Sequence, residues 1–149
     1  MGSTNLTPHQ RETTMSKLEG GCQCGAVRYE ITGALMGVGA CHCRDCQYAS
    51  GGGPNYVALA PKDGFAFTKG EPRRYERAGG SGEMVSRVFC ADCGTPLISE
   101  GALPFHPVKV GSLDDPSSLQ PMVHIWTSSA QPWHPIDPAL PAFPENPPS

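Results

Sequence analysis

Apolar and polar residues alternate in short runs along most of this chain. In AVRYEI, residues 26–31, the apolar Val27, Tyr29 and Ile31 alternate with charged residues. A period of two is the pattern of a β-strand with one buried face. Six further runs, each bounded by Gly, Pro, Asp or Ser, are typical of short strands: NYVALA (55–60), FAFTKG (65–70), MVSRVFC (84–90), TPLIS (95–99), PVKVGSL (107–113) and PMVHIW (121–126).

None of these runs carries a helical stripe of useful length, with apolar residues at i, i+3 and i+4. The one segment that favours a helical turn is DDPSSL, residues 114–119, where Asp114 can act as the cap and Pro116 can lie early in the turn. The 18 Gly and 16 Pro among 149 residues also oppose long helices. We therefore predict a mainly β fold of several small antiparallel sheets with little helix.

The two ends of the chain differ from its middle. Residues 1–18 are polar and aperiodic, and Met15 is placed to be an original start, so we predict a disordered or vector-derived leader. The folded zinc domain is expected over residues 19–131. In residues 132–149 proline recurs at every third position, the period of a polyproline II helix. We expect this tail to strap the domain surface; a ligand for a proline-recognising partner is the alternative.

Charge and hydropathy exclude several classes of partner. The formal net charge is -3, and the 11 Lys and Arg residues are scattered, which predicts neither nucleic-acid nor anionic-membrane binding. The N-terminal segment lacks the apolar region of a secretory signal, and no apolar run is long enough to span a bilayer. We therefore expect a cytoplasmic protein, and in a reducing compartment clustered cysteines are more often metal ligands or catalytic groups than disulfides.

The 7 cysteines fall into three groups, and two of these groups predict a structural metal site. CQCG contains Cys22 and Cys24, and CADCG contains Cys90 and Cys93. A C-x-C or C-x-x-C pair followed by glycine is typical of tight zinc-binding turns, where we expect the glycine N–H to point at a thiolate. Two such pairs supply the four ligands of a tetrahedral zinc, with Zn–S distances of about 2.3 Å. The alternative is a set of reduced, buried thiols without metal.

The third group, CHCRDC, holds Cys41, Cys43 and Cys46, and no further pair remains to complete it. Three protein ligands with an open position are typical of a catalytic zinc. Two alternatives remain open at this stage. The cysteines can act as a metal-free redox group, or a histidine can close the site. The candidates for closure are His42, His106, His124 and His134.

A zinc held by three thiolates is soft, and the ligand it accepts best is another thiolate, which predicts a thiol substrate. The segment that follows the third group is rich in groups that can hold a carboxylate or peptide backbone beside the metal, with an ordinary flexible loop as the alternative. These candidate substrate contacts are Ser50, the N–H groups of Gly51, Gly52 and Gly53, and the amide of Asn55.

The order of these motifs resembles the glutathione-dependent formaldehyde-activating enzyme family, also called the GFA or centromere protein V type. The matching segments are GGCQCGAVRYEI, CHCRDCQYASGG, FAFTKGEPRRY, RVFCADCGTPL, VGSLDDP and HIW. The resemblance implies a zinc-bound β-tent fold with a structural zinc on Cys22, Cys24, Cys90 and Cys93 and a second zinc on Cys41, Cys43 and Cys46. It also implies a carbon–sulfur lyase activity that joins glutathione to formaldehyde as S-hydroxymethylglutathione.

Two functions follow from these observations. The first is a zinc enzyme, with two zinc ions per chain, that adds a small thiol such as glutathione to a small carbonyl or releases it. The second is a non-catalytic, zinc-stabilised module that binds a protein partner. The sequence between the second and third cysteine groups is brief, so we expect a short member of the family.

Overall fold

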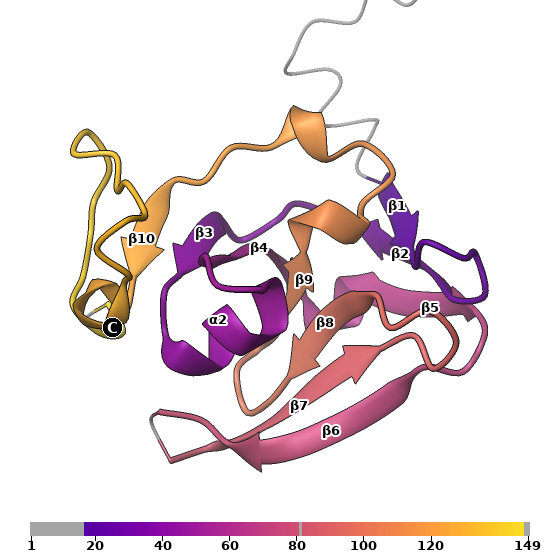
Figure 1. Ribbon diagram of the computed structural model, residues 1–149. Coiled ribbons are helices and arrows are strands. Elements are labelled where there is room, and N and C mark those ends of the chain that lie inside the picture. Colours follow the sequence, from indigo (N-terminus) through magenta and orange to yellow (C-terminus); the bar gives the residue numbers. More distant parts are fainter. Residues whose placement is uncertain (1–16, 81, 148–149) are drawn as a thin grey trace, which may run out of the picture.

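The computed structural model describes residues 17–80 and 82–147. Within these ranges the chain is mainly β, as predicted (Figure 1). The strands are β1 (Lys17–Gly21), β2 (Arg28–Thr32), β3 (Val38–Cys41), β4 (Asn55–Pro61), β5 (Phe65–Lys69), β6 (Arg73–Ala78), β7 (Met84–Phe89), β8 (Pro96–Glu100), β9 (Phe105–Lys109) and β10 (Val123–Ile125). The helices are α2 (Arg44–Ser50) and the short 3-10 turns η1 (Lys62–Gly64), η2 (Val110–Ser112), η3 (Pro116–Ser118) and η4 (Thr127–Ser129).

The strands form two sheets that share one core. A three-stranded antiparallel sheet has the order β1-β2-β5, and a seven-stranded sheet has the order β10-β3-β4-β9-β8-β7-β6. In the larger sheet only β10 and β3 are paired in parallel among the described strands. Tyr29 and Ile31 of the small sheet meet Ala60, Ile98 and Val108 of the large sheet in the hydrophobic core. The alternation predicted for residues 26–31 thus buries the expected residues.

Three strands and the α-helix were not predicted. In β6 all six side chains are exposed, so no apolar alternation marks it, and its pairing with β7 creates the strand. Lys17 and Leu18, expected at the end of the leader, belong to β1, and β3 is short and contains glycine. Helix α2 begins after Cys43, whose Sγ accepts the backbone N–H of Cys46 as an N-cap. The remaining leader residues lie outside the described ranges.

Both C-terminal predictions are refined by the structure. The turn predicted over residues 114–119 is present as η3, but its cap is Asp115, because Asp114 instead forms an ion pair with Arg28. The proline-rich tail folds back beside β10, where the N–H of His124 donates to Pro141 and the N–H of Phe143 donates to His124. Within the described ranges, no helix has the length and apolar character needed to cross a membrane.

Candidate metal centres

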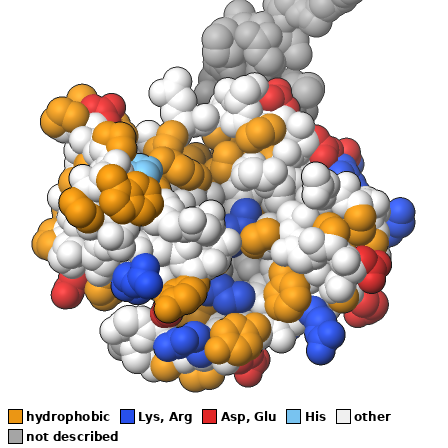
Figure 2. All heavy atoms as spheres, in the orientation of Figure 1, with side chains coloured by type: hydrophobic (Ala, Val, Ile, Leu, Met, Phe, Trp, Pro, Cys, Tyr) orange, Lys and Arg blue, Asp and Glu red, His pale blue; other side chains and the backbone are white. Residues whose placement is uncertain are grey.

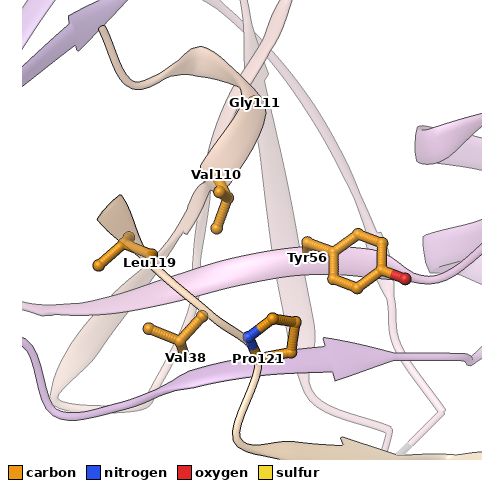
Figure 3. Close-up of a pocket in the computed structure, with 6 residues that line it drawn as sticks. All are labelled: Val38, Tyr56, Val110, Gly111, Leu119 and Pro121. Atoms are coloured by element: carbon orange, nitrogen blue, oxygen red, sulfur yellow. The ribbon is translucent and has the colours of Figure 1, made fainter. Parts of the chain in front are cut away.

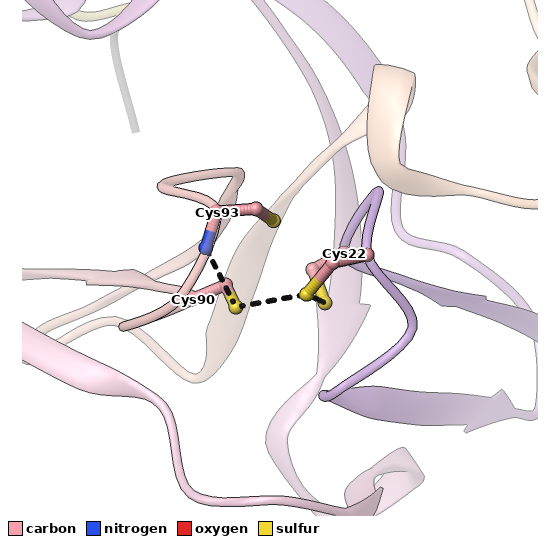
Figure 4. A group of neighbouring side chains, drawn as sticks. Cys22, Cys90 and Cys93 are labelled. Atoms are coloured by element: carbon pink, nitrogen blue, oxygen red, sulfur yellow. Dashed lines mark hydrogen bonds between the residues drawn. The ribbon is translucent and has the colours of Figure 1, made fainter.

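The first cysteine cluster joins the turn before β2 to the turn between β7 and β8. The cluster comprises Cys22, Cys24, Cys90 and Cys93, and the labelled side chains converge from the two turns in Figure 4. The glycine after each pair, Gly25 or Gly94, has a positive φ that permits the tight turn, as predicted. Its N–H, however, donates to the carbonyl of Cys22 or Cys90 rather than to a sulfur.

Other backbone N–H groups supply the hydrogen bonds to sulfur in this cluster. Val27 donates to Cys22 Sγ at 3.2 Å, and Asp92 donates to Cys90 Sγ at 3.3 Å. Hydrogen bonds lower the pKa of Cys93 to about 5, and the Thr95 hydroxyl, 3.1 Å from Cys93 Sγ, has the largest effect. The contacts from Val27 and Thr95 favour the thiolate forms of Cys22 and Cys93, and the thiolate is the form that ligates a metal.

The spacing of the four sulfur atoms fits a tetrahedral metal site. All four lie within 4.8 Å of one another, with Cys22 and Cys24 Sγ at 3.6 Å and Cys24 and Cys90 Sγ at 3.8 Å. A tetrahedron with Zn–S bonds of about 2.3 Å has sulfur–sulfur edges of about 3.8 Å. The donor set and its spacing therefore suit zinc, and the cluster could hold such an ion.

The second cysteine cluster lies where β3 ends and α2 begins. Cys41 is the last residue of β3, Cys43 is the N-cap of α2, and Cys46 is in the first turn of the helix. Their three sulfur atoms lie within 4.8 Å of one another. Cys46 is buried, whereas Cys41 and Cys43 are half-buried, so the cluster is closed on its inner side and reaches the surface on the other. This cluster could hold a second metal ion.

Histidine does not complete the second cluster. No histidine nitrogen from residues 17–80 or 82–147 joins the three sulfur atoms as a ligand group. His42 is buried and is engaged away from the second cysteine cluster, with its Nε2 2.9 Å from Nδ1 of His124. The His134 ring packs against the His42 ring with centroids 5.3 Å apart, and His106 lies against Phe65. Among the described residues, no histidine is therefore placed to close the second cluster in this structure.

The loop after α2 contributes less to the second cluster than its composition suggests. The N–H groups of Gly51 and Gly52, which the sequence offered as substrate contacts, both donate to the carbonyl of Gln47 in this structure. The Ser50 hydroxyl donates to the carbonyl of Gly53, and Gly53 packs beside His134. A substrate role for these four residues stays a prediction.

Asn55 is the member of that loop region that reaches the second cysteine cluster. It is buried at the start of β4, opposite Cys41, and its side chain is close enough to Cys46 to lower the pKa of that thiol. Hydrogen bonds from Cys41 and Cys43 lower the pKa of Cys46, with further contributions from the charge of Arg87 and from this Asn55 contact.

The register of the large sheet brings two cations to the same face as the second cluster. Val57, two residues after Asn55, pairs with Lys109, and Arg87 of β7 pairs with Ser99. Side chains two residues apart on a strand, and those directly opposite across strands, share a face. The sequence contained no signal for Arg87 or Lys109, because they lie 41 and 63 positions after Cys46, the last cysteine of the second cluster.

Lys109 is the most unusual of these residues. Its residue surface is only 7 % exposed, and its Nζ has no hydrogen-bond partner among the described residues. Burial lowers the pKa of Lys109 to about 8, and the neighbouring Cys46 charge acts in the opposite direction. The amine therefore stays mostly protonated at neutral pH and gives the second cluster a positive surrounding.

An apolar hollow of about 410 Å³ lies on the opposite face of β3 and β4 (Figure 3). Val38 and Tyr56 form part of its wall, and they alternate with Cys41 and Asn55 along their strands. The remaining wall is formed by Val110, Gly111, Leu119 and Pro121. Because it has no charged lining residue and lies behind the sheet, this hollow is separate from the cysteine chemistry.

Comparisons with known proteins agree with this architecture. Residues 17–129 match the profile of the family described as glutathione-dependent formaldehyde-activating enzyme. No curated protein matches the chain significantly. A crystal structure of a Rhodobacter sphaeroides protein has a similar fold, with a TM-score of 0.54 and 18 % identity over 85 % of this chain and 99 % of that one. Because the family profile spans most of the chain and both cysteine clusters, this protein belongs to the glutathione-dependent formaldehyde-activating enzyme family.

Proposed function

We propose that this protein is a zinc-dependent enzyme of the carbon–sulfur lyase type. It binds a small thiol such as glutathione at Cys41, Cys43 and Cys46 and catalyses its addition to a small carbonyl such as formaldehyde, or the reverse release. The observation that carries the proposal is the convergence of three cysteine sulfur atoms on a partly exposed site without a fourth protein ligand among the described residues. Membership of the family supports the same chemistry.

Zinc bound at an open site of this kind acts as a Lewis acid that favours the thiolate form of a thiol ligand. The chain itself supplies the three cysteine ligands and the Asn55 contact to Cys46, which fixes one of them. Lys109 and Arg87 lie near Cys46 and favour the approach of an anionic sulfur.

The reaction balances without an oxidant or reductant. A bond forms between the substrate sulfur and the carbonyl carbon, while the carbonyl π electrons move to oxygen, which takes up the proton that the thiol has lost. His42 is engaged with His124, and Asp45 lies 3.8 Å from Arg77, so neither is assigned as the proton carrier. The site contributes by holding the thiol in position.

The test is a thiol titration of the protein with cobalt(II) in place of zinc, followed by absorbance. Glutathione should change the cobalt spectrum, and S-methylglutathione, which lacks the thiol, should not. Cys43→Ser should abolish the response. Exchange of formaldehyde into the glutathione adduct, followed by NMR, should be faster with wild-type protein than with this variant. A metal-replete protein with no spectral response and no faster exchange would contradict the proposal and favour the protein-binding module.

A further inference from the structure

Charges are segregated between the two faces of the large sheet. On the face opposite the second cluster, Arg74 pairs with Glu100 at 2.9 Å, and Glu76 accepts a hydrogen bond from Ser86. On the face that carries Cys41, strands β3, β4 and β6 to β9 present basic side chains but no acidic side chain. By the pairing registers its cations are Arg73, Arg77, Arg87 and Lys109. The described acid that approaches this face is Asp45 of α2, beside Arg77.

The surface view agrees with this distribution. Lys and Arg side chains gather in Figure 2 around the central hollow and between α2 and the hairpin of β6 and β7. A basic surface beside a three-cysteine site attracts anions and repels cations.

The two inner cations are placed to contact a ligand of the second cluster. Cys41 of β3 and Lys109 of β9 are separated by two strand spacings across the sheet and by two residues along it. Their Cα atoms are therefore about 12 Å apart. The two side chains point to the same side of the sheet. Arg87 has one guanidinium nitrogen 3.5 Å from the Ser99 hydroxyl, which orients the group.

We propose that Lys109, together with Arg87, binds a carboxylate of the thiol substrate and makes the site selective for anionic thiols. This inference rests on the proposed function, because it needs a thiol bound at the second cluster. A buried ammonium group without a hydrogen-bond partner is costly, and a carboxylate close to the substrate sulfur would satisfy it.

A different role for Lys109 would be to neutralise the charge of a metal held by three thiolates. Such a role requires no substrate and would affect all thiols equally. The Lys109 Nζ donates to none of the described groups, including the three sulfur atoms, so its hydrogen-bonding capacity remains available to a ligand. The two roles make different predictions for a matched pair of thiols.

The experiment uses 3-mercaptopropionate and its methyl ester, which share a carbon skeleton and differ in charge. Each is titrated into the cobalt-substituted protein, and the dissociation constants are compared. Wild-type protein should bind the acid about 10- to 100-fold more tightly than the ester, the range expected for a charge-assisted contact. Lys109→Met should weaken the binding of the acid far more than that of the ester and so bring this ratio close to 1, and Arg87→Gln should reduce the ratio in part.

Lys109→Arg should retain the preference, and Lys69→Met is the control, because Lys69 is exposed on β5 of the other sheet. Equal affinity of wild-type protein for acid and ester would overturn the inference and leave the proposed function intact. Equal weakening of both ligands by Lys109→Met would assign Lys109 to charge compensation. If neither thiol changes the spectrum, the proposed function fails and the carboxylate assignment fails with it. The comparison of acid and ester on wild-type protein can overturn the inference even if a variant does not fold.

Discussion

Replacing one cysteine in each cluster should have very different effects on the stability of the protein: a large effect for Cys90→Ser and a small one for Cys43→Ser. Cys90 is 1 % exposed, belongs to the hydrophobic core and lies in the cluster that ties the turn before β2 to the turn between β7 and β8. Cys43 is half-buried at the start of α2. Serine at position 43 preserves the helix cap, since its oxygen can accept the Cys46 N–H that sulfur now accepts at 3.3 Å.

The expected magnitudes differ accordingly. A structural zinc site contributes about 10–16 kcal/mol to folding, whereas a whole domain is stable by about 5–15 kcal/mol. Loss of the first site therefore exceeds the stability available, and Cys90→Ser should be unfolded or should retain no cooperative transition. Cys43→Ser keeps its cap, lies outside the core cluster and should change the free energy of unfolding by about 1 kcal/mol or less.

Zinc content and thermal unfolding followed by circular dichroism distinguish these outcomes. Wild-type protein should contain close to two zinc ions per chain, and Cys43→Ser close to one, with a folded spectrum and a cooperative transition. Cys90→Ser should lose the transition. The reasoning is refuted if Cys43→Ser unfolds like Cys90→Ser, or if Cys90→Ser retains wild-type stability.

Three other substitutions test individual contacts. Asn55→Leu removes the contact to Cys46 and should weaken zinc affinity at the second site about 10- to 100-fold in a competition titration with a chelator, while the fold is kept; unchanged affinity would contradict this. Burial raises the pKa of Tyr29 from 10.0 to about 12, so the unfolded state loses this proton first as the pH rises. The free energy of unfolding should therefore fall by about 2–3 kcal/mol between pH 10 and 12, and denaturant unfolding of Tyr29→Phe should lack this fall. The hydrogen bond from Arg74 lowers the pKa of Glu100. Because this pair is partly exposed, it should stabilise the protein by less than about 1 kcal/mol at a pH above 4.5, the ordinary pKa of Glu. The difference in free energy of unfolding between wild-type protein and Glu100→Gln should vanish as the pH falls through the lowered pKa.

The sequence by itself determined the features that depend on neighbouring residues. The alternation in residues 26–31 predicts the buried face of β2, and the spacing of the cysteine pairs before Gly25 and Gly94 predicts the four-sulfur cluster. Each turn is fixed locally, since glycine permits the positive φ that the turn needs. The group of Cys41, Cys43 and Cys46 is likewise visible in six consecutive residues.

The surroundings of the second cluster were decided only by the tertiary structure. Arg87 and Lys109 become its neighbours through the register of strands distant in the sequence, and a shift of one residue would place them on the other face. Strand β6 likewise depends on its partner, because its six exposed side chains carry no alternation. Three thiols indicated where a metal can be held, but long-range pairing determined that a buried ammonium group faces them, and with it the charge of the ligand that we propose the site accepts.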